Sequence, residues 1–189
     1  MKILRAAAHK RMPWKNGGGV TTEITVHPEG ASLGSFDWRL SMATVSADGP
    51  FSLFAGIDRT LSVLEGEGIL LSVDGLADAR LTRATAPFAF PADRQASARL
   101  IGGPILDFNV MTRRDGIDHR VERIDGRRQV APESEATTVI FCGSGTAVVT
   151  CDRVNETLAV HDAAILDAVC DVTPATGADV YLVKLTRST

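Results

Sequence analysis

The sequence predicts an all-β protein made of two fused jelly-roll barrels or sandwiches, with little helix. Apolar and polar residues alternate with a period of two through most of the chain, which is typical of half-buried strands. Turn signals rich in Gly, Pro and Asp recur about every 8–12 residues, as in sandwiches and barrels. Residues 63–68 and 140–145 share one pattern, an apolar strand end followed by a Gly-x-Gly turn, which indicates an internal repeat.

In the first half, the alternation indicates a series of short strands joined by turns. Residues 65–68, Glu-Gly-Glu-Gly, have the composition of a hairpin turn between two apolar runs. Residues 106–112 alternate again and place Asp107 and Asn109 on the same face of a strand. The expected strands of this half cover residues 20–26, 36–43, 59–64, 69–73, 98–101 and 106–112.

Residues 113–135 are polar and contain two Asp-Gly turns, so we expect extended segments and loops that join the two halves. We place the halves at residues 1–115 and 116–189 of one compact unit, an arrangement that leaves room for strands to be exchanged between them. The strands expected in the second half cover residues 137–142, 146–151, 157–160, 163–166 and 180–186.

Composition narrows the choice of partners and of compartment. The net charge of −3 and the lack of a basic run argue against a nucleic-acid partner. No apolar run approaches the roughly 20 residues of a membrane-spanning helix, and the first residues lack the features of a signal peptide. We therefore expect a cytoplasmic protein, in which Cys142, Cys151 and Cys170 are buried, reduced thiols.

The stretch PWKNGGG at residues 13–19 is the most unusual part of the sequence. Three consecutive glycines carry a large conformational entropy cost, which indicates a position where the backbone must turn tightly or approach another group closely. The stretch lacks the Gly-Lys-Ser/Thr ending of a phosphate-binding loop. Since Trp14, Lys15 and Asn16 precede the glycines, we expect a ligand-facing loop, with a tight turn or β-bulge as the structural alternative.

Residues 63–66, Val-Leu-Glu-Gly, resemble a turn of the cupin superfamily. In cupins the first motif supplies two histidines and a glutamate that hold a metal ion. None of these ligands is present here, because Arg59 occupies the glutamate position and an arginine repels a cation. The resemblance therefore implies a cupin fold without a metal and without a cofactor. The remaining ligand positions fall on Ser52 and Phe54, or Leu53 and Ala55, and on Ala96.

More specific segments resemble the HutD/Ves family, in the order in which the family carries them. This resemblance implies a bicupin fold, a cytoplasmic role and, for the HutD branch, a small-molecule-binding regulator of histidine utilisation rather than a catabolic enzyme. Because cupins often pair sheet to sheet, it also implies a homodimer. The matching segments cover residues 13–19, 22–24, 36–43, 49–52, 56–61 and 107–111.

Within these segments, cationic and uncharged polar residues predict a pocket for a small carboxylate, because guanidinium binds carboxylate in a two-pronged geometry. Urocanate and formylglutamate, intermediates of histidine breakdown, are carboxylates of this kind. The expected ligand-binding residues are Trp14, Lys15, Asn16, Gly17, Thr22, Arg39, Ser41, Arg59, Asp107 and Asn109.

Each of these interpretations has a plainer alternative. Arg39 could lie on a solvated strand face, Asp58 and Arg59 could pair in a surface turn, and Asp107 could serve only to neutralise an arginine. At the level of function, a metal-independent enzyme could use Lys15 with Asp107 or Glu23 for acid–base chemistry. A structural protein with a vestigial pocket is the third possibility.

Overall fold

The computed structural model describes residues 1–14 and 19–188. These residues form β-strands almost throughout, and the short 3-10 helix η1 (Ala6–Ala8) is the one helical element among them. The prediction of an all-β fold with little helix is therefore confirmed. The chain forms two compact units, an N-terminal unit (Lys10–Ile117) and a C-terminal unit (Met1–His9 with Asp118–Thr189).

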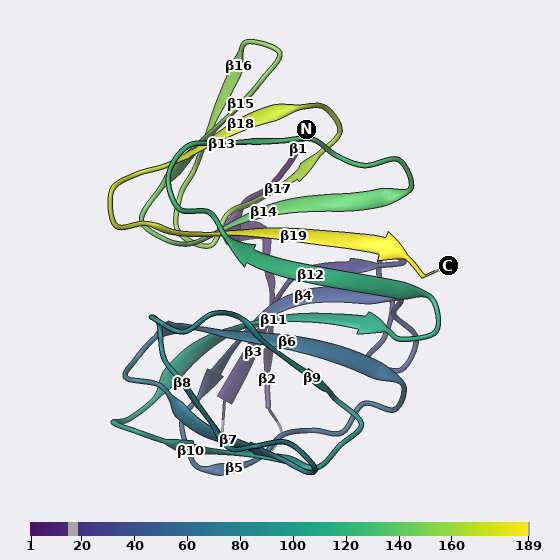
Figure 1. Ribbon diagram of the computed structural model, residues 1–189, viewed down its shortest axis with the longest axis vertical. Coiled ribbons are helices and arrows are strands. Elements are labelled where there is room, and N and C mark those ends of the chain that lie inside the picture. The colour runs from purple at the N-terminus through teal and green to yellow at the C-terminus, as the bar shows by residue number, and fades with distance from the viewer. Residues whose placement is uncertain (15–18, 189) are drawn as a thin grey trace. The chain divides into compact units, whose positions relative to one another are not determined.

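The N-terminal unit contains two antiparallel sheets, one large and one small (Figure 1). The larger sheet has the order β2 (Lys10–Pro13), β3 (Gly19–His27), β4 (Trp38–Val45), β11 (Ile105–Arg113), β6 (Ile57–Glu65) and β9 (Phe88–Pro91). The smaller sheet has the order β5 (Gly49–Pro50), β10 (Ala96–Leu100), β7 (Ile69–Val73) and β8 (Ala79–Leu81).

The C-terminal unit repeats this topology. Its larger sheet has the order β1 (Lys2–Leu4), β17 (Ala163–Leu166), β14 (Ala136–Ser144), β19 (Asp179–Arg187) and β12 (Ile117–Arg123). Its smaller sheet has the order β13 (Arg128–Val130), β18 (Cys170–Pro174), β15 (Ala147–Cys151) and β16 (Val154–Leu158). The two similar sequence segments, 63–68 and 140–145, lie at equivalent places, where β6 leads to β7 and β14 leads to β15.

The first nine residues belong to the C-terminal unit because β1 completes its larger sheet. Lys2 lies opposite Ile165 and Leu4 lies opposite Ala163 in antiparallel register. Next to this strand, the Ala6 N–H donates to Asp162 Oδ1 at 2.8 Å. Figure 1 shows the purple N-terminal strand beside β17.

Each unit has its own apolar core between its two sheets. In the N-terminal unit, Leu61 and Val63 of the larger sheet pack with Ile69, Leu71 and other residues of the smaller sheet. In the C-terminal unit, Ile140 and Leu182 pack in the same way with residues of the smaller sheet. This is the arrangement expected when alternate residues of each strand face the opposite sheet.

The cysteines correct one sequence-based expectation. Cys151 of β15 lies opposite Cys170 of β18, with their Cα atoms 4.4 Å apart, and the two form a disulfide. The expectation of three reduced thiols is therefore wrong for this pair. Cys142 is outside any disulfide and is buried, and burial raises the pKa of its thiol to about 11. Cys142 is therefore a poor nucleophile near neutral pH.

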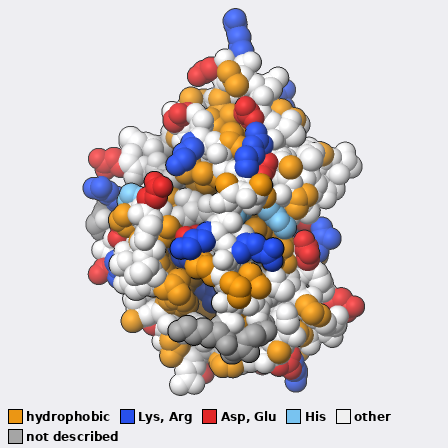
Figure 2. Space-filling model, turned by 180° about the vertical axis from the view of Figure 1, so that it is seen from behind, with side chains coloured by type: hydrophobic (Ala, Val, Ile, Leu, Met, Phe, Trp, Pro, Cys, Tyr) orange, Lys and Arg blue, Asp and Glu red, His pale blue; other side chains and the backbone are white. Residues whose placement is uncertain are grey.

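No helix in the described part of the chain is long and apolar enough to cross a membrane. Charged side chains are dispersed over the face shown in Figure 2, where groups of Lys and Arg stand apart from one another with acidic or apolar side chains beside them.

Candidate functional site

The inner face of the larger sheet of the N-terminal unit carries a cluster of polar side chains. Ser41 of β4 lies opposite Asn109 of β11. One alternation further along, Arg39 of β4 and Arg59 of β6 lie on either side of β11. Asp107 is two residues from Asn109 and therefore points to the same face. This face is the one that carries the apolar core, so the polar side chains are buried with it.

Arg59 is held from several sides. Its Nε donates to Asn109 Oδ1 at 2.8 Å, and its guanidinium carbon lies 4.5 Å from the ring centroid of Phe51 and 5.7 Å from that of Phe90. Only 6% of Arg59 is exposed. Burial lowers its pKa to about 10, although Asp107 opposes that effect. The group therefore remains cationic at neutral pH.

Asp107 is fully buried, at 0% exposure. Its Oδ1 accepts a hydrogen bond from Asn109 Nδ2 at 2.6 Å, so the Asn109 amide links Asp107 to Arg59. Burial raises the pKa of the Asp107 carboxyl to about 6, although Arg59 and the Asn109 hydrogen bond act to lower it. The other oxygen, Oδ2, is buried and has no hydrogen-bond partner among the described residues.

Arg39 forms the second cationic position of the cluster. Its Nε donates to Glu23 Oε2 of β3 at 2.7 Å, and Nη1 lies 3.4 Å from Ser41 Oγ, a long contact. Nη2 is buried and lacks a hydrogen-bond partner in the described part of the structure. A buried donor without an acceptor costs about 1–3 kcal/mol. This N–H group is therefore available to an acceptor on a ligand.

Contacts between Trp14, which follows β2, and Gly19, the first residue of β3, explain why one of the three consecutive glycines is needed. The Trp14 N–H donates to the Gly19 carbonyl at 2.9 Å, and Trp14 Nε1 donates to Thr21 Oγ1 at 2.7 Å. A Cβ atom at Gly19 would lie 2.1 Å from the Thr44 carbonyl oxygen and 3.1 Å from the Trp14 ring. Only glycine fits at this position, because the backbone and the indole approach it closely.

Comparison with known proteins assigns the chain to a family. The sequence profile of the HutD family matches residues 6–182, nearly the whole chain. The chain belongs to the HutD family. The resemblance inferred from the motifs at residues 13–111 is thereby confirmed. Among the relatives of this HutD-family chain is an uncharacterized 21.2 kDa protein from the hutC 3′ region of Pseudomonas putida. It is 42% identical over 144 residues, which cover 76% of this chain and 74% of the relative.

Other comparisons agree with this assignment and with the fold. Protein Ves of Citrobacter koseri is 37% identical over 120 residues, 61% of each chain. The structure of HutD from Pseudomonas fluorescens SBW25, solved in a formate condition, is 36% identical with a TM-score of 0.85, over 100% of this chain and 99% of that one. The more distant YhhW of Escherichia coli, 8% identical with a TM-score of 0.67 over 97% and 96% of the chains, shares the fold.

The structure brings together half of the residues expected to bind a ligand in this HutD-family protein: Arg39, Ser41, Arg59, Asp107 and Asn109. Trp14 lies at the strand edge with its indole N–H already bonded to Thr21. Thr22 does not join the cluster, because it lies opposite Met42 and points away from the face that carries Glu23 and Ser41. Lys15, Asn16 and Gly17 lie outside the described residues.

Two of the plainer alternatives are wrong. Arg39 is 4% exposed, so it does not lie on a solvated face. Asp58 pairs with Arg114 at 2.9 Å, whereas Arg59 points to the inner face, so the two do not pair in a surface turn. The third alternative agrees with the structure in part, because Asp107 stabilises the charge of Arg59.

Sequence reasoning missed the aromatic contacts of Arg59 and the role of Glu23. The Glu23 partnership with Arg39 follows from the pairing of β3 with β4, which sets Glu23 opposite Ser41. The alternation of residues 20–26 indicates the face of Glu23, but the partner depends on register. Phe51 follows the short strand β5 and Phe90 lies opposite Arg59, and neither placement has a signal in the sequence.

The donor set of the inner face does not suit the metal that many cupin folds hold. Among the described residues, no three or more His, Cys, Asp or Glu side chains converge as ligands. Arg59 occupies the position expected for a ligating glutamate, and a guanidinium repels a cation. The bacterial pirin YhhW of Escherichia coli, a remote structural neighbour, has a structure in complex with nickel(II). At 10% identity, that metal is a property of YhhW and is not transferred to this chain. No step through a metal ion is assigned to this HutD-family site.

Proposed function

We propose that this protein binds a small carboxylate metabolite on the inner face of the N-terminal unit and regulates histidine utilisation through that binding. The relative from the hutC 3′ region and the HutD structure of P. fluorescens support the pathway. Urocanate and formylglutamate are metabolites of the matching chemistry, since each carries a carboxylate. The binding itself and the regulatory role are the proposal.

One observation carries this proposal: the buried Nη2 of Arg39 has no acceptor in the described part of the chain. A carboxylate oxygen would satisfy it, and hydrogen bonds between charged groups are about twice as strong as neutral ones. Arg59 supports the same ligand class, because it stays cationic at neutral pH with a pKa of about 10. Because Glu23 pairs with Arg39 and Asp107 stabilises the charge of Arg59, a carboxylate would be held by directed hydrogen bonds from the guanidinium groups rather than by an excess of positive charge.

Besides its carboxylate, the ligand should have a second polar group, and we expect this group to bind Asp107 rather than Asn109. Both ends of the Asn109 amide are engaged, by Arg59 and by Asp107. Asp107 Oδ2 is the buried acceptor that still lacks a partner among the described residues. An N–H group on the ligand would satisfy it. The imidazole of urocanate and the formamide of formylglutamate both provide such a donor.

Isothermal titration of the full chain with urocanate and formylglutamate tests the proposal. The uncharged amide of the same acid serves as the control ligand. Arg39→Met is expected to abolish most of the affinity, whereas Arg120→Met, at a 77% exposed side chain, is expected to leave it unchanged. Bound carboxylate at 100 times Kd should add about 2.7 kcal/mol to the free energy of unfolding. Equal binding of acid and amide, or no binding of either, would refute the carboxylate site.

A metal-independent enzyme is the second candidate, and the raised pKa of Asp107 favours it. A carboxyl with a pKa of about 6 can exchange protons near neutral pH. Glu23 is less suited to this chemistry because it pairs with Arg39. Mass spectrometry of a bound metabolite over hours distinguishes the two, since turnover that is lost in Asp107→Asn would establish an enzyme. Absence of both binding and turnover would leave the vestigial pocket of a structural protein.

Residence in the cytoplasm, where the Cys151–Cys170 disulfide would have to persist against cellular reductants, and pairing of two chains sheet to sheet complete the proposal. Sedimentation at several protein concentrations tests the pairing. A mass that stays at the 20.1 kDa of one chain would exclude the dimer.

A further inference from the structure

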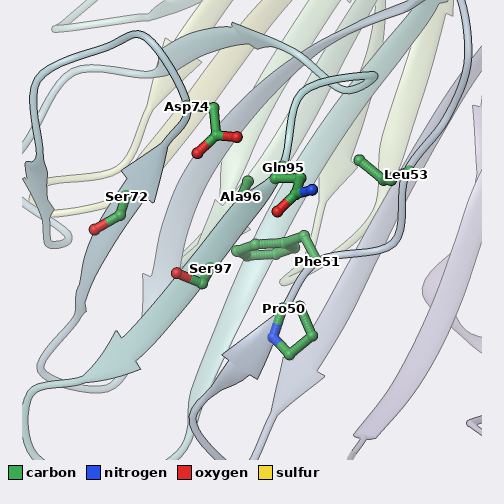
Figure 3. A pocket seen from close by; sticks show the side chains of 8 residues that line it. All are labelled: Pro50, Phe51, Leu53, Ser72, Asp74, Gln95, Ala96 and Ser97. Atoms are coloured by element: carbon green, nitrogen blue, oxygen red, sulfur yellow. The ribbon is translucent and has the colours of Figure 1, made fainter.

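A small cavity lies on the outer face of the smaller sheet of the N-terminal unit, where Ser72 and Ser97 are exposed. Its volume is about 300 Å³, and Pro50, Phe51, Ser72 and Ser97 contribute to its lining. Ser97 of β10 lies opposite both Pro50 of β5 and Ser72 of β7, so these three form a row across the smaller sheet. Figure 3 shows the Phe51 ring among the side chains that line the cavity, between Gln95 and Pro50. The cavity therefore extends over the smaller sheet to the Phe51 ring.

Phe51 belongs to the cavity and to the buried site at once. Its ring lines the cavity, and the ring centroid is 4.5 Å from the guanidinium carbon of Arg59. Arg59 is almost fully buried, whereas Phe51 is half-buried. The ring therefore covers the cation on one side and meets the cavity.

The side chain of Phe51 can move more easily than its backbone. The Phe51 N–H donates to the Ala96 carbonyl at 2.9 Å, which anchors the backbone to β10. The segment that follows, up to β6, has no regular strand or helix, and Leu53 within it is 58% exposed. Rotation of a partly exposed side chain is fast and needs no rearrangement of the sheet.

We propose that the cavity is the vestibule of the Arg59 site and that the Phe51 ring is the gate between them. A small carboxylate enters the cavity, the ring turns aside, and the anion reaches the guanidinium. The exchange is favourable because the cation–π contact is weak and a charge-assisted hydrogen bond is stronger. This inference rests on the proposed function for the identity of the ligand, but the gate itself can be tested without one.

The test measures how fast phenylglyoxal, an arginine-specific reagent, modifies Arg59 in the full chain, with peptide mass spectrometry to locate the product. Phe51→Ala is expected to raise the rate at least about tenfold, which corresponds to about 1.4 kcal/mol. Leu53→Ala is the matched control, since Leu53 lines the same cavity but is 58% exposed and is not one of the two rings that cover Arg59. It should leave the rate unchanged. If Phe51→Ala folds poorly, Phe51→Leu replaces it in the test. Because leucine keeps an apolar side chain but lacks the ring, its modification rate should lie between those of the wild type and Phe51→Ala.

A second variant tests the path. Ser97→Trp fills the cavity from an exposed position and should slow the modification of Arg59 in the Phe51→Ala background. Ser46→Trp, at an exposed position outside the lining, should not. An unchanged rate in Phe51→Ala would overturn the gate. An unchanged rate on adding Ser97→Trp would overturn the vestibule and place the entrance elsewhere.

Ligand kinetics separate this inference from the proposed function. With a bound carboxylate, Phe51→Ala should raise the association and dissociation rates together, by about tenfold each, and change Kd much less. Accelerated modification without any carboxylate binding would refute the proposed function and leave the gate standing. Carboxylate binding with the same association and dissociation rates in the wild type and in Phe51→Ala would refute the gate and leave the proposed function standing.

Discussion

Replacing Asp107 by asparagine tests whether this carboxyl is buried at a cost to stability. The pKa of Asp107 rises from the ordinary 3.8 to about 6 on folding. At about 1.36 kcal/mol per pKa unit, this corresponds to about 3 kcal/mol. Between about pH 4 and pH 6 the folded protein keeps a proton at Asp107 that the unfolded chain has released. The free energy of unfolding should therefore fall as the pH rises through this range.

Asp107→Asn removes this titration, because its amide stays neutral at every pH. Relative to the variant, the wild type should lose about 2 kcal/mol between pH 4 and pH 7, because at pH 4 the unfolded chain has already released part of this proton. Any constant cost of the new amide group contributes equally at both values and cancels from the comparison. Trp14 and Trp38 both lie in the N-terminal unit, so their fluorescence during urea unfolding reports on the unit that contains Asp107.

The control is Asp78→Asn, at an exposed carboxyl in the same unit, which should follow the pH dependence of the wild type. Parallel pH dependences of Asp107→Asn and the wild type between pH 4 and pH 7 would show that burial does not raise the pKa of Asp107. A loss of stability of the variant relative to the wild type as the pH rises would show the opposite, that folding favours the charged form of Asp107.

Two further predictions concern stability. Arg59→Met leaves the Asp107 carboxylate without its compensating cation and should lower the free energy of unfolding at pH 7 by about 3–5 kcal/mol. Adding Asp107→Asn should restore at least half of this loss in a double-mutant cycle, and strictly additive effects would contradict the coupling. Reduction of the Cys151–Cys170 disulfide, whose cysteines are 19 residues apart in sequence, should cost about 3 kcal/mol. Thermal unfolding after reduction, verified by a mass gain of two hydrogens, provides the measurement, and an unchanged melting temperature would contradict it.

The alternation of polar and apolar residues was enough to predict the strands of the site. It indicated that Asp107 shares a face with Asn109, and in the strand expected at residues 36–43 the same period of two sets Arg39 and Ser41 on one face. It did not indicate that these faces are buried, because alternation distinguishes two faces without saying which one meets the core. In β4 nearly every residue on both faces is buried, so its polar side chains lie inside the protein.

Pairing between distant strands accounts for what the sequence did not predict. Glu23 meets Arg39 only through the register of β3 on β4. Cys151 meets Cys170 only through the register of β15 on β18. Such registers depend on long-range contacts, and a single sequence contains the residues but not their alignment.

The pairing of β1 with β17 also has a consequence for biosynthesis. All strands of the N-terminal unit lie within residues 10–117, so they can pair before the ribosome has made the rest of the chain. Strand β1 is made before any strand of the N-terminal unit and must wait for β17, which is made after all of them, since Lys2 lies opposite Ile165. A nascent chain without those first residues would leave β17 as an open sheet edge, which is a site for pairing with other chains. A strand that precedes the N-terminal unit in the sequence thus protects the edge of a strand that follows it.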